Sequence, residues 1–283
     1  MQSIRSLRSR IKSVENTGQL SRSMKMIAAA KLRRNQEKAG AQRLYAQECA
    51  KMLSSYLAAV PDCSNPFTRR NAEIKKRCYV LFVGSRGLCG TYNRSMLRYM
   101  HELADREEGE YLLVVCGRWG KENVPASGFN VLRCYENVSD TPSPEETEEI
   151  CSYLKELYLE CEADEIVLVY QSHNGSKPGE PGCLTLLPAN PEGGEKLGEY
   201  IIEPDKQSVL DTLSSLYIGS SLYTALLEAK MSEHFARMAA MTAAADNTEQ
   251  LVKELTLELN HARQEAITTE ITELVNSSTA DIR

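Results

Sequence analysis

The chain has 283 residues, of which 42% are hydrophobic and 25% are charged, an ordinary composition for a globular protein. No stretch approaches the roughly 18 consecutive apolar residues that a membrane-spanning helix needs. Residues 1–12 are polar and basic, without the apolar core of a signal peptide. The composition therefore argues against a membrane-spanning protein, and we expect a cytoplasmic one.

The net charge of −6 is unevenly distributed. Residues 1–56 contain twelve Lys/Arg and three Asp/Glu, a net +9, whereas the remainder carries 21 basic and 36 acidic residues, a net −15. A basic arm on an acidic body indicates a nucleic acid, an acidic membrane surface or an acidic protein as partner. The basic residues are spread around the arm without interleaved aromatic residues, which argues against nucleic acid.

Residues 1–60 contain no proline and only two glycines, Gly18 and Gly40. Apolar residues recur at intervals of three and four, the pattern of an amphipathic helix with a narrow apolar seam. The members of this seam are Ile4, Leu7, Ile11 and Val14, continued by Leu20, Met24 and Ile27. We expect one long helix that ends at Pro61.

Residues 67–204 have a different pattern. Continuous apolar runs at 77–84, 111–117 and 166–170 predict strands covered on both faces. Helical stretches at 93–105 and 144–161 alternate with them, and Ser143 is a candidate N-cap for the second. This alternation predicts a mostly parallel α/β sheet. Residues 183–187 could add an edge strand, and we expect residues 174–182 and 188–198 to be exposed loops.

Residues 205–283 contain no proline and a single glycine, Gly219. An apolar stripe extends from Leu222 to Leu274, with Leu251, Leu255 and Leu259 as its main knobs. A helix over residues 209–275 would be roughly 100 Å long, longer than a small α/β domain is wide. Because neither terminal helix can bury its seam alone, we expect the two to pair. The predicted domains are an N-terminal helix (1–60), an α/β domain (61–204) and a C-terminal helix (205–283).

Candidate sites for small ligands are weak. Gly84, Gly87 and Gly90 follow a strand, but the spacing is not that of a dinucleotide or P-loop motif, so a tight turn is the better interpretation. The nine cysteines form no C-x-x-C pair and indicate reduced thiols. His234 and His261 have no partner at metal spacing and are expected to be solvated or at the seam edge. We expect no catalytic, cofactor or metal site.

Several long motifs, in order, resemble the gamma subunit of bacterial F-type ATP synthases. They occupy residues 4–17, 23–31, 84–90, 200–205, 225–234, 237–241, 245–247 and 260–264. The resemblance covers both helical arms nearly end to end and the intervening domain more loosely. It implies an antiparallel coiled coil of the N- and C-terminal helices with an inserted Rossmann-like α/β domain.

The resemblance also implies a function. Gamma is a noncatalytic rotor shaft that couples the membrane c ring to the catalytic sites of the beta subunits. Its partners are the alpha and beta subunits, the epsilon subunit and the c ring, at the cytoplasmic face of the bacterial membrane. Contacts with the alpha/beta ring would come from Arg8, Lys12, Met24, Lys25, Arg263 and Thr269. Contacts with the c ring and epsilon would come from Tyr200 and Glu203.

The sequence departs from the family pattern at two points, and two other functions remain as alternatives to the rotor. Thr269 stands where many family members have Gln, and the closely spaced regulatory cysteine pair of chloroplast versions does not occur. A coiled-coil scaffold or nucleic-acid-binding protein with an inserted α/β domain is one alternative. An α/β enzyme whose helical arms only dimerise it is the other. Copurification with alpha and beta subunits would distinguish the rotor from both.

Overall fold

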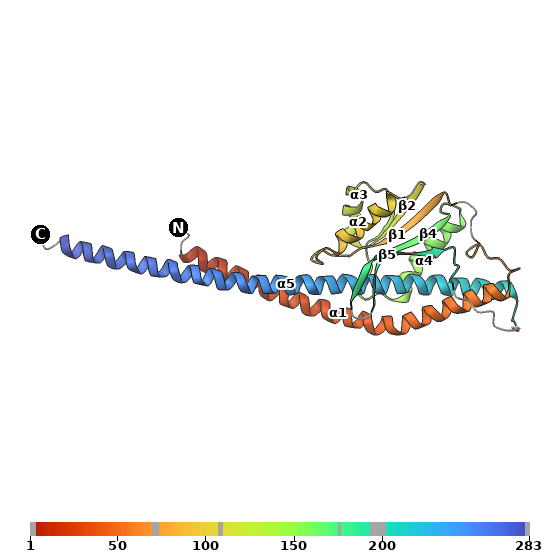
Figure 1. Ribbon diagram of the computed structural model, residues 1–283, viewed down its shortest axis with the longest axis horizontal. Helices are drawn as coiled ribbons and strands as arrows, with labels where there is room; N and C mark the ends of the chain where they lie inside the picture. The colour runs from red at the N-terminus through yellow and green to blue at the C-terminus, as the bar shows by residue number, and fades with distance from the viewer. Residues whose placement is uncertain (1–3, 70–73, 107–109, 175–176, 193–201, 281–283) are drawn as a thin grey trace. The chain divides into compact units, whose positions relative to one another are not determined.

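The computed structural model describes residues 4–69, 74–106, 110–174, 177–192 and 202–280, with only the backbone of residues 273–280. It divides into two compact units. The helical unit comprises Met1–Ile27 and Met238–Arg283, and the α/β unit comprises Ala28–Arg237. Two long helices, α1 (Ile4–Ala59) and α5 (Lys206–Ala280), each contribute residues to both units (Figure 1).

Local sequence explains where the long helices begin and end. The helix α1 ends just before Val60 and Pro61, because proline lacks the N–H that would continue the hydrogen-bond ladder. The helix α5 begins after Asp205, whose carboxylate accepts the Ser208 backbone N–H at 2.9 Å and the Ser208 hydroxyl at 2.7 Å. Asp205 thus caps N–H groups that the first turn leaves unpaired. These ends lie close to the predicted boundaries, but the compact units divide both helices further along.

The α/β unit contains a five-stranded sheet in the order β3-β2-β1-β4-β5. The strands are β1 (Lys76–Phe82), β2 (Glu110–Cys116), β3 (Val131–Tyr135), β4 (Glu165–His173) and β5 (Pro178–Leu187). The first four are parallel, and β5 pairs with β4 in the antiparallel sense. The apolar runs of β1, β2 and β4 form the centre, as the sequence predicts for strands buried on both faces.

Helices cover both faces of this sheet (Figure 1). One face packs against α2 (Tyr92–Ala104) and α3 (Arg118–Ala126) through a cluster that includes Met96, Met100 and Val124. The other face packs against α4 (Pro144–Leu159) and the parts of α1 and α5 in this unit, including Leu53 and Leu210. The unit is therefore a three-layer, doubly wound α/β fold, as the sequence predicts.

Two elements of the sheet region were not predicted. None of the five residues of the edge strand β3 is fully buried, and its sequence, interrupted by Arg133, contains no continuous apolar run. The helix α3 contains Gly120 and Pro125, both poor helix formers, yet Gly120 is needed because a Cβ there would lie 2.3 Å from Val115 Cγ1. The expected loop at 174–182 is partly wrong, because β5 already begins at Pro178.

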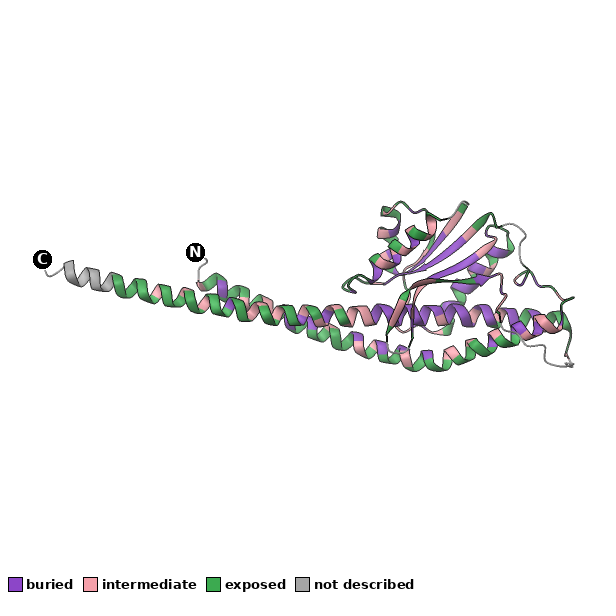
Figure 2. Ribbon diagram, in the orientation of Figure 1, coloured by how far each residue is buried: buried purple, intermediate pink, exposed green. Residues whose placement is uncertain are grey.

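In the helical unit, α1 and α5 pair in antiparallel directions, and only a narrow set of side chains is buried (Figure 2). Leu7 is 3% exposed and Leu255 is 2% exposed. A Cβ on Gly18 would lie 2.7 Å from the side-chain Oγ1 of Thr248, so Gly18 packs directly against that side chain. With Thr248 in place, a larger residue at position 18 would clash with its hydroxyl.

The predicted course of the N-terminal seam is wrong at Leu20 and Ile27, whereas Met24 is half-buried as Ile11 and Val14 are. Leu20 and Ile27 are 57% and 56% exposed, whereas Gly18, Ser21 and Ala28 are buried. Steps of three and four residues from Leu7 lead to these small residues, whereas the prediction chose the larger apolar residues nearby. The size of the side chains at the interface, and not their hydrophobicity, therefore determines which residues of α1 face α5.

Candidate functional site

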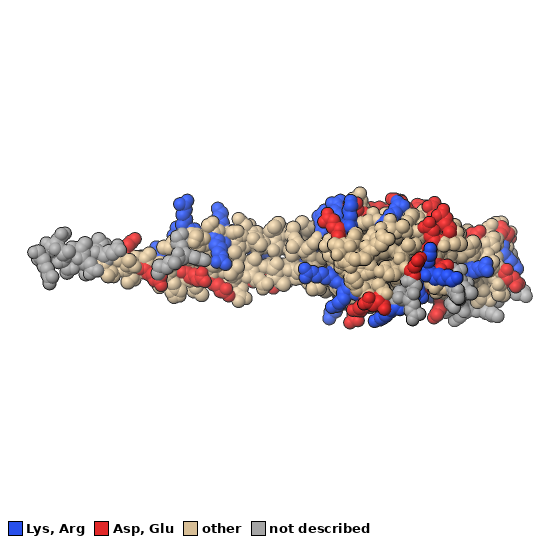
Figure 3. Space-filling model, turned by 90° about the horizontal axis from the view of Figure 1, so that it is seen from above, with Lys and Arg blue, Asp and Glu red and all other residues tan. Residues whose placement is uncertain are grey.

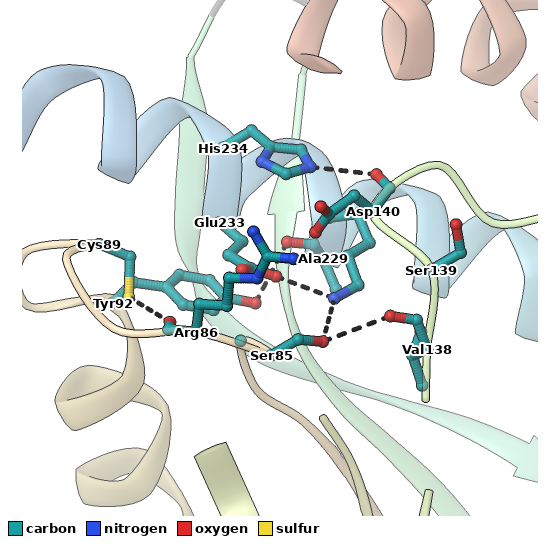
Figure 4. Close-up of polar contacts among 12 residues, drawn as sticks. Ser85, Arg86, Cys89, Tyr92, Val138, Ser139, Asp140, Ala229, Glu233 and His234 are labelled. Atoms are coloured by element: carbon teal, nitrogen blue, oxygen red, sulfur yellow. Dashed lines mark hydrogen bonds and ion pairs between the residues drawn. The ribbon is translucent and has the colours of Figure 1, made fainter. Parts of the chain in front are cut away.

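A buried network of charged side chains lies where α5 passes the carboxyl end of β1, within the α/β unit (Figure 4). Its centre is Glu233, which is 1% exposed. The Glu233 carboxylate accepts hydrogen bonds from Lys230 Nζ at 2.9 Å and from Arg237 Nη2 at 2.6 Å. Burial alone would raise the pKa of Glu233, but Lys230 and Arg237 lower it below its usual value. Glu233 is therefore ionised at neutral pH.

The network reaches two loops of the sheet. Lys230 Nζ donates to Ser85 Oγ at 3.2 Å, and the Ser85 hydroxyl donates to the Val138 carbonyl oxygen at 3.3 Å. Arg237 Nη2 also donates to the carbonyl oxygen of Arg86 at 3.3 Å. Ser85 and Arg86 follow β1, and Val138 follows β3, so a single helix contacts two strand-to-helix loops.

His234 adds a link to the loop that precedes α4. Its Nε2 lies 3.0 Å from the carbonyl oxygen of Asp140, and its Nδ1 lies 3.2 Å from Arg237 Nη1. The carbonyl can only accept and the guanidinium can only donate, so the ring is neutral with its proton on Nε2. Burial lowers the pKa of His234, consistent with this tautomer. The expected solvated histidine is wrong, because His234 is 1% exposed.

The helix α1 joins the network through Asp140. Lys31 Nζ forms an ion pair with the Asp140 carboxylate, and Asn35 Nδ2 donates to the Asp140 carbonyl oxygen at 2.9 Å. Burial would raise the pKa of Asp140, but the hydrogen bond and charge of Lys31 outweigh it and lower the pKa. Both long helices are thereby tied to the same residue. We call the set Lys31, Asn35, Ser85, Asp140, Lys230, Glu233, His234 and Arg237 the polar joint.

The glycine loop after β1 is shaped by this joint. A Cβ on Gly84 would lie 3.0 Å from Asn93 Oδ1 and 3.1 Å from Glu233 Oε1. Gly84 is therefore needed for close approach and not for a positive φ, whereas Leu88 (φ 61°) and Gly90 (φ 58°) adopt the left-handed conformation. In doubly wound folds, ligands bind beyond the carboxyl ends of the strands. Here the carboxylate of Glu233 occupies that position.

A second polar contact ties α1, α5 and β4 together. Arg43 Nη2 donates to Glu228 Oε1 at 2.6 Å and to the carbonyl oxygen of His173 at 2.7 Å. The His173 ring is fully buried, and neither ring nitrogen has a hydrogen-bond partner among the described residues. Burial lowers its pKa, and Phe235 packs edge-on with ring centroids 6.0 Å apart. His173 is thus held as a neutral ring whose two polar nitrogens are buried without a partner among the described residues.

The structure leaves the residues that the resemblance assigns to the alpha/beta ring on the surface of the helical unit. Arg8, Lys12 and Lys25 on α1 are exposed, and Met24 is half-buried. Arg263 and Thr269 on α5 are also exposed, and the Thr269 hydroxyl donates to the Glu265 carbonyl oxygen at 2.9 Å. Their contacts with a partner stay predictions.

The remaining predicted residues fall in different places. Of the predicted seam residues, Leu7 and Leu255 are buried, and five are half-buried: Ile4, Ile11, Val14, Leu251 and Leu259. Glu203 is exposed just before α5, and Tyr200 lies outside the described residues. The proposed contacts of Tyr200 and Glu203 with the c ring and epsilon also stay predictions.

The basic charge of the first 56 residues is partly matched within the α/β unit. Lys31 pairs with Asp140 and Arg43 with Glu228, while Lys and Arg are interspersed with Asp and Glu on the face shown in Figure 3. Elsewhere in the unit, Asp164 Oδ2 accepts the Lys75 N–H at 2.8 Å, and Glu165 pairs with Arg77 at 2.5 Å. Lys31 and Arg43 therefore have structural partners within the chain.

All nine cysteines are free thiols. Among the described residues, no cluster of His, Cys, Asp and Glu is placed to hold a metal ion. None of the helices in the described ranges is both long and apolar enough to cross a membrane.

The polar joint was missed from the sequence, although one signal was present. Lys230, Glu233 and Arg237 have the three- and four-residue spacing of helical ion pairs, and they directly follow residues 222–229 of α5, which are apolar except for Thr224 and Glu228. Charges in a stretch that must be buried have to find partners. The partners in the loops, Ser85 and Asp140, are 145 and 94 residues distant from Lys230 and His234 and could not be read from spacing.

The fold is that of a doubly wound α/β unit in which Glu233 of its own helix α5 lies against the glycine loop after β1. The ATP synthase family model matches residues 3–280. The ATP synthase gamma chain of Halothermothrix orenii is 37% identical over 286 residues, covering 99% of each chain. That of Moorella thermoacetica is 37% identical over 281 residues, again covering 99% of each. The chain therefore belongs to the ATP synthase gamma chain family.

Solved structures agree on the fold. A chain in the structure of the OSCP, F1 and c-ring assembly of Euglena gracilis mitochondrial ATP synthase gives a TM-score of 0.66 at 17% identity, covering 98% of this chain and 94% of that one. A rotor chain of the same synthase gives 0.63 at 16% identity, covering 93% and 98%. The predicted fold class and family resemblance are confirmed.

Proposed function

We propose that the chain is the central rotor shaft of a proton-translocating, F-type ATP synthase, and that it is a noncatalytic subunit. The observation that carries the proposal is the full-length relationship to ATP synthase gamma chains. The paired helices and the closed α/β crevice fit a part that transmits force without binding substrate. Its partners are the alpha and beta subunits, the epsilon subunit and the c ring, at the cytoplasmic face of a bacterial membrane.

The physical basis of coupling is differential contact. A helix pair whose surface is not the same all round contacts each surrounding beta subunit differently at each orientation. Each orientation then favours one conformation of a given beta subunit, and rotation shifts that conformational equilibrium. The exposed cations Arg8, Lys12 and Lys25 on α1 suit an acidic loop of the beta subunit. The narrow buried seam leaves these side chains available.

Copurification tests this function directly. A tagged chain, expressed in its own host, should bring down alpha and beta subunits in an assembly with ATPase activity. A scaffold, a nucleic-acid-binding protein or a dimeric α/β enzyme would not do so. Recovery of the chain without alpha and beta subunits would contradict the proposal.

The noncatalytic role has its own test. The isolated chain should show no ATPase activity and no tight ATP binding by calorimetry, because Glu233 occupies the position beside Gly84 where a phosphate would approach. The control is the purified assembly under the same conditions, which should hydrolyse ATP. Binding of ATP to the isolated chain at micromolar concentration would contradict a noncatalytic shaft.

The contact with the c ring and epsilon is tested at Glu203, which is exposed just before α5. Glu203→Lys should loosen coupling, so that proton pumping in membrane vesicles falls while ATP hydrolysis by the alpha and beta subunits is unchanged. Glu258→Lys, an exposed charge reversal on α5 in the helical unit, is a control for the charge change at a position assigned to no contact with the c ring or epsilon. Unchanged pumping in Glu203→Lys would remove the assignment to the c ring and epsilon.

A further inference from the structure

We propose that the polar joint is the torque-bearing connection within the chain, fixing the rotational register of α1 and α5 on the α/β unit. This inference rests on the proposed rotor function. A shaft transmits torque only if the domain that receives it cannot slip on the helices that carry it onward. The joint lies at the last turns of α5 that belong to the α/β unit, from Lys230 to Arg237, immediately before α5 continues into the helical unit.

Apolar packing alone is a poor means of fixing a helix against rotation. Along α5, the core contacts of Leu222, Leu226 and Ala229 hold the helix against the sheet. Burial of apolar surface is non-directional, so a small rotation or slide can exchange one contact for another at little cost. Hydrogen bonds weaken steeply when their angles or lengths change. A buried polar network therefore resists the motion that apolar packing tolerates.

The joint has the connectivity that this role requires. From α5, Lys230 reaches Ser85 in the loop after β1, Arg237 reaches the Arg86 carbonyl in the same loop, and His234 reaches Asp140 in the loop before α4. From α1, Lys31 and Asn35 reach the same Asp140. Two long helices are thus tied to two loops of the sheet, and the α5 members Lys230, His234 and Arg237 lie along one face of that helix.

Stability alone does not account for these charges. A buried ion network pays a large desolvation cost, and well-packed apolar residues of similar size are often as stable or more stable. Lys230 and Glu233 have side chains only 3% and 1% exposed, and they follow a largely apolar stretch of α5 from Leu222 to Ala229. A plain apolar helix would satisfy the core at this position. The directional contacts supply a fixed register, which apolar residues would not.

The test replaces the central charges with apolar residues of similar size. In the triple variant Lys230→Met/Glu233→Leu/Arg237→Met, no unpaired charge is left at the centre of the joint, so folding and assembly with alpha and beta subunits should be retained. The matched control is Glu48→Gln/Lys51→Met, which removes an exposed ion pair of the same i,i+3 spacing on α1. Both variants are studied in the complete, purified assembly.

Two measurements report on the joint. The first is ATP-driven proton pumping relative to ATP hydrolysis in reconstituted vesicles. The second is the angular fluctuation of a bead on the exposed thiol of Cys161, in a Cys183→Ser background, while the head of the complex is held on a surface. We expect the triple variant to lose coupling by about 2- to 30-fold, the range found when a coupling network is altered. We also expect its bead to fluctuate through wider angles, with no change in the control.

The outcomes separate this inference from the rotor function itself. A triple variant that assembles and is as stiff and as coupled as the wild-type complex would overturn the torque-bearing joint and leave the rotor intact. Failure of the wild-type chain to assemble would overturn the proposed function. If the triple variant does not fold, Lys31→Met/Asp140→Asn at the partly exposed edge of the joint takes its place. It should reduce coupling at unchanged melting temperature, and unchanged coupling would again overturn the inference.

Discussion

The helix α5 is surrounded very differently in the two units. In the α/β unit, nearly every residue from Leu222 to His234 is buried, including charged ones (Figure 2). In the helical unit, only single, separated positions of α5 are buried, such as Met241, Ala245 and Leu255. The first environment fixes the helix by polar contacts of defined direction. The second holds it by a narrow seam and leaves most of its surface for partners.

Because of this difference in burial, the effect of a substitution has a different cause in each unit. Where only a few side chains are buried, each of them contributes much of the stability of the helix pair, and neighbouring positions contribute little. Where a helix is buried all round, the cost of a change depends on whether a polar group loses its partner. The predictions below test this difference, from the largest expected effect to the smallest.

The largest effect is expected at the seam of the helical unit. Leu255 is 2% exposed, and truncating a buried Leu to Ala costs about 2–5 kcal/mol. Leu255→Asp adds an unpaired charge to that loss, so it should separate the helix pair and prevent assembly with alpha and beta subunits. Leu257→Asp, at a position that is 61% exposed, is the matched control and should assemble normally. Equal assembly of both variants would show that the pair is not held by this seam.

The next prediction concerns pH and the α/β unit. Burial lowers the pKa of His173 and of His234 from the ordinary 6.5, so both are neutral in the folded protein and bind protons more readily when it unfolds. The stability gained by keeping them neutral is present above about pH 6.5 and is lost as the pH falls below it. The charges that face them are Arg43 and Glu228 for His173, and Arg237, Glu233 and Asp140 for His234.

Thermal melting followed by circular dichroism measures this effect. His173→Leu should reduce the loss of melting temperature on acidification, because a ring without hydrogen-bond partners is replaced by an apolar side chain. His261→Leu changes an exposed histidine in the helical unit and should leave the pH dependence as it is. The assignment fails if both variants lose stability with pH as the wild type does.

A smaller effect distinguishes two glycines of α1. Ala is favoured over Gly in a helix by about 0.5–1 kcal/mol, and nothing lies within 4 Å of a Cβ on Gly40. Gly40→Ala should therefore stabilise the protein. Gly18→Ala should not, because its Cβ would lie 2.7 Å from Thr248 Oγ1 in the close pairing of the helical unit.

A double substitution sharpens that comparison. Adding Thr248→Ala to Gly18→Ala removes the clashing hydroxyl, so the double variant should show the stabilisation that Ala gives over Gly in a helix. Thr248→Ala alone is the control. The measurement is thermal denaturation of the purified chain. Equal stabilisation by Gly18→Ala and Gly40→Ala would indicate that Gly18 does not pack directly against Thr248.

The smallest effect is expected near the end of α5. Thr269 is exposed and its hydroxyl bonds only within its own helix, so Thr269→Ala should change stability by less than about 0.5 kcal/mol. Rotation-coupled ATP synthesis should be nearly intact in this variant, and also after removal of residues 278–283. If Thr269→Ala abolished synthesis while Leu255→Asp did not, the end of the shaft would be a specific site and not one contact among many.

The sequence by itself determined the elements that strong local patterns encode. The long proline-free helices and the apolar runs of the central strands follow from periodicity, and the start of α4 at Pro144 follows from the preference of proline for the first helical turn, although the Ser143 side chain makes no capping hydrogen bond. The family motifs supplied the fold class. Such signals are local, because hydrogen bonds within a helix and burial on both faces of a strand each constrain neighbouring residues.

Only the tertiary structure decided which side chains are brought together. It showed that Gly18, Ser21 and Ala28 form the seam where Leu20 and Ile27 were expected, because direct packing, as of Gly18 against the Thr248 side chain, selects small residues over larger apolar ones. It also placed Glu233 against Gly84 and Lys31 against Asp140, which are more than 100 residues apart in the chain. A buried charge must have a partner, but its identity depends on how distant segments pack, and that information is not in the spacing of residues along one helix.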